Sequence, residues 1–495
     1  MVTNMPHPMD TTPAPLRDTD DSMRLATLPV RALLRRPPVT VSPDTPIRDA
    51  ARLMRDERVS SLLVVHQDQL IGLVTDRDLR NRVLAADRDP QTAVVDIATT
   101  AVQTVDVTDH AFDALLLMAR LNVHHVPVME DTRVIGVITA TDLQRQQSNA
   151  AVNLAGALYA QDSLDGLVQI STRIGELQRQ LAAAGTPAHA AGRLVSAMTD
   201  ALTARLLQLG EARLGSPPVP YAWVAAGSQA RNEQTAKSDQ DNCLVLDDAY
   251  NPTAHGPYFE QLARWVCDGL NACGYVYCPG EMMAMTATWR QPLARWRAYF
   301  RQWIEQPEPK ALMLTCVFFD QRFVYGERAL LDTLRTEVLQ RTPGQRIFLA
   351  HMVSNALSHQ PPLGWLGGLH TIRGGKHDGT IDLKHSGIVP IIDLARVYAL
   401  AGGILAVSTR ERLQAAASSG EITPERTRDL IDALDFLAQL RIQHQARLLA
   451  EGRPADNYLR LDELSDLERR HLKDAFAVVK DLQGVLERRY VAGRF

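Results

Sequence analysis

Hydrophobic and polar positions divide the 495-residue chain into segments of different periodicity. Residues 1 to about 27 are rich in Pro, Thr and Asp and show no apolar repeat, which predicts a flexible tail. From about 28 to 147, short apolar runs alternate with helical patterns. From about 148 to 215, apolar residues recur three and four positions apart, which predicts a helical linker built as a hairpin. Several domains are expected from a chain of this length.

The region that follows the tail contains an internal repeat. Residues 40 to 79 match residues 104 to 143 without a gap, so that Gly72, for example, corresponds to Gly136. Each copy predicts a short strand, a helix, two mostly apolar strands and a second helix, or βαββα. Each unit alone would leave an apolar sheet uncovered, so the two are expected to pack as a pair.

This repeat resembles a tandem pair of cystathionine β-synthase (CBS) domains over about 28 to 147. In that family a Thr or Ser, followed three residues later by Asp at a strand-to-helix turn, holds an adenosine nucleotide. The match falls on Thr75 with Asp78 and on Thr139 with Asp142. A carboxylate can accept hydrogen bonds from ribose hydroxyls, and a Thr hydroxyl with helix amides suits phosphate. The resemblance implies AMP or ATP as a regulatory ligand and a homodimer through the CBS pair; helix capping without a ligand is the alternative.

The helical hairpin between about 148 and 215 leads from the repeat to the rest of the chain. Two interpretations stay open for it. It either transmits a conformational change from the repeat, or it serves only as packing or as a dimer seam.

The segment from 216 to 341 opens with a pattern typical of a phosphate-binding turn. The apolar run "YAWVAA" predicts a buried strand, Gly227 a tight turn, and Ser228 the N-cap of a helix through "QARNEQ". A strand, a Gly-Ser turn and a helix N-terminus together form a cradle for phosphate.

Two carboxylates follow this turn. Residues 239 to 246 predict a strand with period two, so that Asp239 and Asp241 point to the same face. Carboxylates that converge beside a phosphate cradle predict a site for a divalent metal. An EF-hand is excluded, because its Gly and Glu positions hold Leu244 and Tyr250, and no Walker A motif occurs. A strand edge protected by charge is the structural alternative.

A Gly-Ser pair, ten residues and then Asp-x-Asp resemble the nucleotidyltransferase superfamily that includes DNA polymerase beta. The longer stretch "GSQARNEQTAKSDQDN" is closer to the amino-terminal domain of protein-PII uridylyltransferases and to bacterial signal-transduction proteins that couple CBS pairs to this domain. The superfamily needs a third carboxylate on a later strand, and "ALMLTCVFFDQRFVYG" predicts a strand ending in Asp320. The resemblance therefore implies Asp239, Asp241 and Asp320 as the catalytic, Mg²⁺-binding set.

The chemistry implied by this resemblance is nucleotidyl transfer with two metal ions. A hydroxyl of an acceptor, such as a protein, would attack the α-phosphate of a nucleoside triphosphate, and pyrophosphate would leave. Gly227 and Ser228 would hold the outgoing phosphates. Arg231 and Lys237 are further candidates for phosphate binding, with ordinary solvated side chains as the alternative.

From about 342 to 495 the pattern is helical again and resembles the carboxy-terminal domain that accompanies the transferase domain in the same signal proteins. A basic cluster near a Gly-rich turn lies in "HTIRGGKHDGTIDLKHSGIVPIIDLARVYAL" and makes Lys384 and Arg396 candidates for substrate binding. A solvated basic face is the alternative. The expected fold class is α/β and α+β: a tandem βαββα CBS pair, a helical linker, a nucleotidyltransferase α/β domain and a helical carboxy-terminal domain.

Composition narrows the function further. Fifty-three basic and 57 acidic side chains give a net charge of −4, which offers no strongly basic surface for nucleic acid. The five cysteines lack paired CxxC spacing and are typical of core residues in a reducing cytoplasm. No signal peptide or apolar run of about 18 residues occurs, so a cytoplasmic protein without a membrane span is expected.

Three functional hypotheses follow from the sequence. The first is an Mg²⁺-dependent, uridylyltransferase-like nucleotidyltransferase regulated by adenosine nucleotides at a CBS pair. The second is a non-catalytic sensor whose transferase-like domain binds nucleotide or a partner without turnover, which fold resemblance alone does not exclude. The third is a CBS regulator that acts on another protein in trans.

Overall fold

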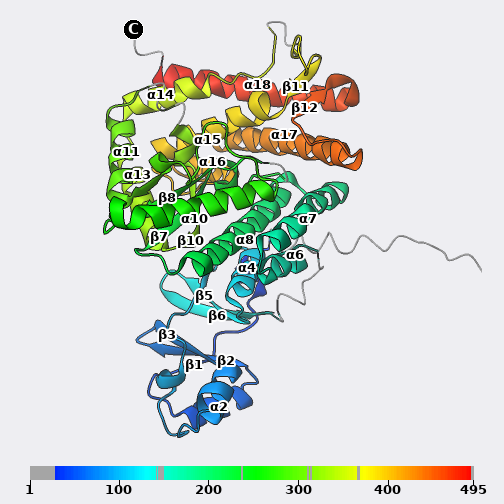
Figure 1. Ribbon diagram of the computed structural model, residues 1–495. Helices are drawn as coiled ribbons and strands as arrows, with labels where there is room; N and C mark the ends of the chain where they lie inside the picture. The colour runs from blue at the N-terminus through cyan, green and yellow to red at the C-terminus, as the bar shows by residue number, and fades with distance from the viewer. Residues whose placement is uncertain are drawn as a thin grey trace, which may run out of the picture. The chain divides into compact units, whose positions relative to one another are not determined.

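The computed structural model describes residues 28–140, 142, 150–235, 238–308, 312, 315–364 and 368–491. The chain forms two compact units, Met1–Asn153 and Leu154–Phe495, and each is described by itself (Figure 1). Two predicted features lie outside the described residues: the amino-terminal tail and Lys237. The same holds for the predicted second helix of the second repeat, apart from Asp142.

The amino-terminal unit contains the two predicted repeats. The first copy consists of β1 (Thr40–Val41), α2 (Ile47–Asp56), β2 (Ser61–His66), β3 (Gln69–Thr75), α3 (Asp76–Asp78) and η2 (Leu79–Leu84). The second consists of β4 (Val105–Asp106), α4 (Ala111–Leu121), β5 (His125–Glu130) and β6 (Arg133–Thr139). Short helices η1 (Val30–Leu33) and η3 (Val94–Ile97) precede the copies.

The two sheets of this unit share one topology and one register. In each, the first strand pairs in parallel with the second, which pairs antiparallel with the third. Val64 lies opposite Gly72, and Val128 lies opposite Gly136, with a register shift directly after each pair. A Cβ atom on Gly136 would lie 2.4 Å from Leu34 Cδ2. The absence of a side chain at Gly136 therefore leaves room for Leu34, which precedes the first copy, to pack against the second sheet.

The carboxy-terminal unit begins with the predicted helical hairpin. After α6 (Ala150–Ala160), the long helices α7 (Leu164–Ala183) and α8 (Ala188–Leu214) pack on each other. Ser163 caps α7 through a hydrogen bond from the Gly166 amide. Both long helices also contact α17, and α8 contacts α10, so the hairpin packs as part of this unit.

A small sheet stands at the centre of the unit, with strand order β10-β7-β8-β9. Strand β7 (Tyr221–Ala226) is antiparallel to β8 (Asn242–Leu246) and to β10 (Gln321–Gly326), and β9 (Arg290–Pro292) is parallel to β8. Every residue of β7 and β8 is buried, because helices cover the sheet. The covering elements are α10 (Pro252–Ala272), η4 (Ala287–Trp289), α11 (Leu293–Glu305), η5 (Cys316–Phe319) and α13 (Arg328–Arg341).

The remaining elements form a helical region that shares one hydrophobic core with the sheet. They are α14 (Arg346–Ala356), β11 (Thr380–Asp382), η6 (Lys384–Ile388), α15 (Val389–Ala401), α16 (Thr409–Ser418), α17 (Pro424–Ala450), β12 (Tyr458–Arg460), η7 (Leu461–Glu463) and α18 (Asp466–Tyr490). Thr423 caps α17, and Pro424 occupies its first position. The shared core holds basic residues of the helical region close to the sheet.

Three local predictions are wrong. Helix α9 (Gly227–Ala230) has only four residues and its N-cap is Ala226 rather than Ser228, because the chain turns one residue earlier at Gly227. Strand β8 starts at Asn242, and Asp239 forms only an isolated bridge with Val276. Asp320 does not end a strand but precedes β10, because the aromatic residues before it form the turn η5 and enter the core.

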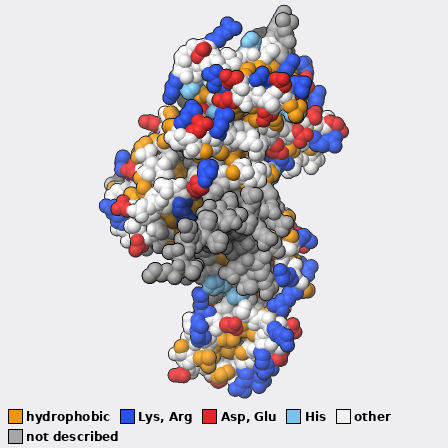
Figure 2. All heavy atoms as spheres, turned by 90° about the vertical axis from the view of Figure 1, so that its right-hand side faces the viewer, with side chains coloured by type: hydrophobic (Ala, Val, Ile, Leu, Met, Phe, Trp, Pro, Cys, Tyr) orange, Lys and Arg blue, Asp and Glu red, His pale blue; other side chains and the backbone are white. Residues whose placement is uncertain are grey.

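The surface agrees with the small net charge. In the upper part of Figure 2, which shows the carboxy-terminal unit, Lys and Arg side chains are interspersed with Asp and Glu side chains. No described helix is both long and apolar enough to cross a membrane.

Candidate functional site

The turn after β7 brings the backbone close to a carboxylate. Gly227 has a φ of 58°, and a Cβ at this position would lie 2.3 Å from Asp241 Oδ2. The Ala226 amide donates to the Asp241 carbonyl at 2.8 Å, which fixes the start of β8 beside the turn. Gly227 is therefore required both by its left-handed backbone and by the absence of a side chain.

Asp239 and Asp241 lie together as predicted, and Cys278 is their third neighbour. One oxygen from each carboxylate and the Cys278 sulfur all lie within 4.8 Å of one another. The Cys278 thiol donates a hydrogen bond to Asp241. Cys278 was predicted, with the other cysteines, to be a core residue, because no sequence pattern distinguishes it and only folding places it beside the two acids.

The negative charges of Asp239 and Asp241 lie close together, and few positive charges of the described residues lie near them. Burial, and then the charge of Asp239, raise the pKa of Asp241 to about 6. A basic group arrives from the helical region: Lys384 Nζ at the start of η6 lies 3.8 Å from Asp239 Oδ1. The structure thus brings the candidate Lys384 to the two acids.

Asp320 lies at the same end of the sheet, on the other side of β7, but its carboxylate is bound by three arginines. It is fully buried and receives hydrogen bonds from Arg231 Nη1 at 2.6 Å, from Arg396 Nη2 at 2.6 Å and from Arg412 Nη1 at 2.5 Å. Although burial alone acts in the opposite direction, these guanidinium charges hold the pKa of Asp320 well below its usual range. The group of Asp239, Asp241 and Cys278 does not include Asp320.

The candidate phosphate- and substrate-binding arginines lie in this buried cluster. Arg231 also donates to Glu233 at 2.8 Å, and Arg396 also forms an ion pair with Asp393. Both arginines are nearly inaccessible to solvent. Ser228, by contrast, is half-buried in α9, and Lys237 lies outside the described residues.

The residues Asp239 and Asp241 suit a divalent cation of the Mg²⁺ type. Such ions prefer oxygen ligands and are commonly held by one or two carboxylates together with substrate phosphates. Burial and the charge of Asp239 both disfavour the ionised form of Asp241 and raise its pKa, and a cation between the two acids would stabilise that form.

The two Thr-Asp pairs of the amino-terminal unit have the same geometry. Asp78 Oδ2 accepts from the Thr75 amide at 2.9 Å and from Thr75 Oγ1 at 2.7 Å. Asp142 Oδ2 accepts from the Thr139 amide at 3.0 Å and from Thr139 Oγ1 at 2.6 Å. Both aspartates therefore accept hydrogen bonds from their own turns. In the first pair this completes a capping box at α3, and the other carboxylate oxygen, Asp78 Oδ1, lies 3.3 Å from Arg82 Nε.

The fold and the sites define two classes of domain: a pair of βαββ modules, and a nucleotidyltransferase-type α/β domain joined to a helical region. Family models agree with this division. Residues 30–85 and 94–149 match the CBS domain, residues 172–310 match the family described as "Putative nucleotidyltransferase DUF294", and residues 346–490 match the "Putative nucleotidyltransferase substrate binding domain". The chain belongs to the CBS-domain proteins and combines a tandem CBS pair with a DUF294 domain and its carboxy-terminal companion.

The curated relatives reported next match only a small share of the chain. CBS domain-containing protein YhcV of Bacillus subtilis (strain 168) is 34% identical over 117 residues, which are 23% of this chain and 84% of that protein. Hypoxic response protein 1 of Mycobacterium tuberculosis (strain ATCC 25618 / H37Rv) is 32% identical over 105 residues, 21% of this chain and 73% of that protein. Among solved structures, CBS domain protein PAE2072 from Pyrobaculum aerophilum, complexed with AMP, shows 28% identity and a TM-score of 0.24, covering 26% of this chain and 98% of that chain.

Proposed function

We propose that the carboxy-terminal unit is an Mg²⁺-dependent nucleotidyltransferase and that the CBS pair regulates it by binding an adenosine nucleotide. The observation that carries the proposal is the convergence of Asp239 and Asp241 beside Gly227, with Lys384 3.8 Å from Asp239. The match of residues 172–310 to a nucleotidyltransferase family supports the same reaction class.

In this proposal each residue of the site has a separate task. Asp239 and Asp241 hold the cation, which when bound supplies positive charge to the triphosphate. Gly227 leaves space beside Asp241, and Ser228 with the neighbouring amides binds phosphate oxygens. Lys384 brings a positive charge from the helical region to the same place, where it would contact substrate.

Asp320 has a different task in the proposed enzyme. Its carboxylate already accepts hydrogen bonds from three guanidinium groups and is inaccessible to solvent. It therefore acts as a positioning residue that fixes Arg231 behind α9 and Arg396 in α15. We propose a hydroxyl group, for example of a protein, as the acceptor, and the uridylyl group as the moiety that is transferred.

The function is tested by label transfer. Full-length protein is incubated with each of the four α-³²P nucleoside triphosphates, Mg²⁺ and a cell lysate, and pyrophosphate release is measured in parallel. We expect one nucleotide to label an acceptor, and Asp239→Asn to lower the rate at least about 100-fold, since even supporting residues of metal sites are worth 10–100-fold. Asp429→Asn on the exposed face of α17 is the control and should retain full activity.

A non-catalytic sensor is the second candidate, because Asp320, the third acid that the superfamily requires, is fully occupied by arginines. The same experiment separates the two functions. Binding of a triphosphate without any release of pyrophosphate, with every nucleotide and with lysate present, would establish the sensor and contradict the transferase.

The regulatory site gives a separate prediction. Asp78→Asn combined with Asp142→Asn should weaken AMP or ATP binding at least tenfold in calorimetry of the full chain, because the loss of a charged acceptor costs about 1.5–3 kcal/mol. Asn keeps a side-chain oxygen that can accept the hydrogen bonds from Thr75 and Thr139, so the two turns should be retained. Asp113→Asn, the same substitution at the carboxylate that caps α4 in this unit, is the matched control. Equal affinity in the double variant and this control would refute the two Thr-Asp sites.

Regulation itself requires a further condition. A nucleotide bound to the CBS pair changes the transferase rate only if it binds two states of the protein unequally. Identical label-transfer kinetics with and without saturating AMP or ATP would leave the pair as a binding or dimerising unit.

A further inference from the structure

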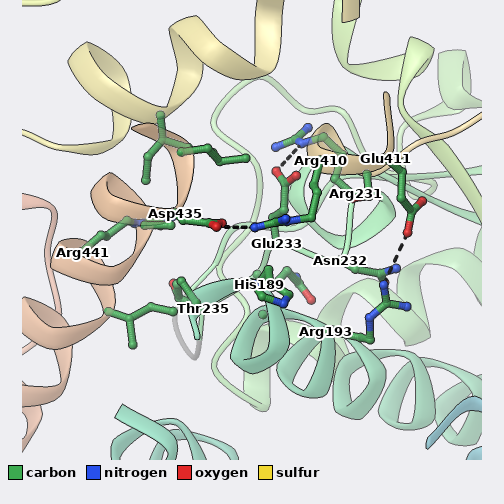
Figure 3. A pocket seen from close by; sticks show the side chains of 18 residues that line it. His189, Arg193, Arg231, Asn232, Glu233, Thr235, Arg410, Glu411, Asp435 and Arg441 are labelled. Atoms are coloured by element: carbon green, nitrogen blue, oxygen red, sulfur yellow. Dashed lines mark hydrogen bonds and ion pairs between the residues drawn. The ribbon is translucent and has the colours of Figure 1, made fainter. Parts of the chain in front are cut away.

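A cavity lined by both charged and apolar side chains lies in the carboxy-terminal unit, and neither Asp239 nor Asp241 lines it. It has a volume of about 90 Å³ and is bordered by α8, by the segment after α9, and by α16 and α17. Figure 3 shows it between α17, which carries Asp435 and Arg441, and α8, which carries His189 and Arg193. Nothing in the proposed transfer reaction uses it.

Among the described residues around this cavity, the guanidinium of Arg441 forms no ion pair with an acid. Three ion pairs border the cavity: Arg231 with Glu233, Arg193 with Glu411, and Arg410 with Asp435. Arg441 lines the same space, and no carboxylate of the described residues forms an ion pair with it. Its Nε donates to Asn457 Oδ1 at 2.8 Å, which leaves its terminal nitrogens for another partner.

Burial makes this unpaired cation costly. Desolvation lowers the pKa of Arg441 to about 10, although the charges of Asp382, Asp239 and Glu233 act in the opposite direction. A guanidinium in such surroundings is normally satisfied by a carboxylate or a phosphate. The cavity therefore has the electrostatics of a site for a small anion.

Buried polar atoms without partners point to the same conclusion. Thr235 and Gln234, which are 3% and 2% exposed, both line the cavity. Thr235 Oγ1, Gln234 Oε1 and Arg410 Nε are buried and have no hydrogen-bond partner among the described residues. Buried polar groups in native proteins are almost always paired, so three unpaired atoms around one cavity indicate a ligand.

The donor and acceptor pattern selects the ligand. Thr235, Arg410 and Arg441 offer hydrogen-bond donors to an oxyanion, whereas the Gln234 oxygen can only accept. A protonated phosphate satisfies both kinds of group, because it has oxygen acceptors and one O–H donor. Sulfate and acetate at neutral pH have no O–H donor for Gln234. At about 90 Å³ the cavity is also smaller than the roughly 150 Å³ that takes a benzene ring, so a nucleobase does not fit.

We propose that this cavity binds a protonated phosphate group, either as free phosphate or as the end of a small phosphomonoester. The site is independent of the proposed transferase reaction, because it requires neither a metal ion nor turnover. Its wall includes the segment from Arg231 to Thr235.

The test is calorimetry of the full chain at pH 6.5 with EDTA present and ionic strength held constant with NaCl. The probes are inorganic phosphate, glycerol 3-phosphate, sulfate and acetate. We expect saturable binding of phosphate or of the ester, with sulfate and acetate at least about tenfold weaker. Tighter binding of inorganic phosphate would identify the ligand as free phosphate, and tighter binding of glycerol 3-phosphate would identify it as a phosphomonoester.

Two variants locate the binding. Arg441→Gln should weaken binding at least about tenfold, and Thr235→Val, which keeps the side-chain shape and removes only the hydroxyl, should also weaken it. Arg428→Gln on the exposed face of α17 is the control. The proposal is overturned by the absence of saturable binding, by sulfate binding as tightly as phosphate, or by unchanged affinity in Thr235→Val and Arg441→Gln.

Discussion

Replacing Asp320 with Asn is expected to lower the free energy of unfolding of the carboxy-terminal unit by about 3–5 kcal/mol, the usual cost of breaking a buried ion pair by removing one partner. The variant leaves Arg231, Arg396 and Arg412 facing a neutral amide in a fully buried position. Urea unfolding followed by circular dichroism at pH 7 measures the loss. Asp429→Asn, on an exposed position of α17, is the control and should change the free energy by less than about 0.5 kcal/mol.

The pH dependence of this loss has a definite sign. The pKa of Asp320 is lowered in the folded protein, so its contribution to stability is fully present above the unfolded pKa of about 4 and is lost as the pH falls towards the folded value. The difference between wild type and Asp320→Asn should therefore be largest near pH 7 and shrink below about pH 4. A variant as stable as Asp429→Asn, but unable to bind Mg²⁺, would instead identify Asp320 as a metal ligand.

The contrast between Asp320 and the pair Asp239 and Asp241 shows which features of the site follow from local sequence. The Gly-Ser turn and the two acids lie within 15 residues, and the structure brings the two acids together beside Gly227, although the strand predicted through them begins only at Asn242. Asp320 was predicted to end a strand, whereas it precedes β10. Its partners Arg396 and Arg412 lie 76 and 92 residues away in sequence, and no local pattern indicates which carboxylate they bind.

Local sequence also predicted part of the fold. The internal repeat predicted the CBS pair, and the matched residues do adopt the same register in both copies, as Val64 with Gly72 and Val128 with Gly136 show. The cavity beside Arg441 could not be predicted, since α8, α16 and α17 meet only through tertiary packing. The position of Cys278 beside Asp239 and Asp241 could not be predicted either, because it also depends on tertiary packing.

Replacing Asp241 with Asn is expected to reduce Mg²⁺ affinity at least about 100-fold, because a direct ligand is worth more than the supporting residues that typically contribute 10–100-fold. Titration calorimetry with Mg²⁺ and a non-hydrolysable triphosphate measures the loss. Asp247→Asn, just beyond the other end of β8, is the matched control and should bind normally. Unchanged affinity in Asp241→Asn would remove this residue from the metal site.

The same variant should make the metal-free protein more stable at pH 8. The pKa of Asp241 is raised to about 6, so the stability of the metal-free wild type falls as the pH rises from about 4 through 6, where the buried carboxylate ionises beside Asp239. Asp241→Asn cannot ionise and should lack this fall, while Mg²⁺ should restore stability to the wild type alone above pH 6. Thermal unfolding from pH 4.5 to 8, with and without Mg²⁺, measures both effects. A fall that persists unchanged in Asp241→Asn would assign the titration to another group. If both the fall and the stabilisation by Mg²⁺ are absent from the variant, the fall comes from ionisation of the buried Asp241 beside Asp239, and the cation offsets it.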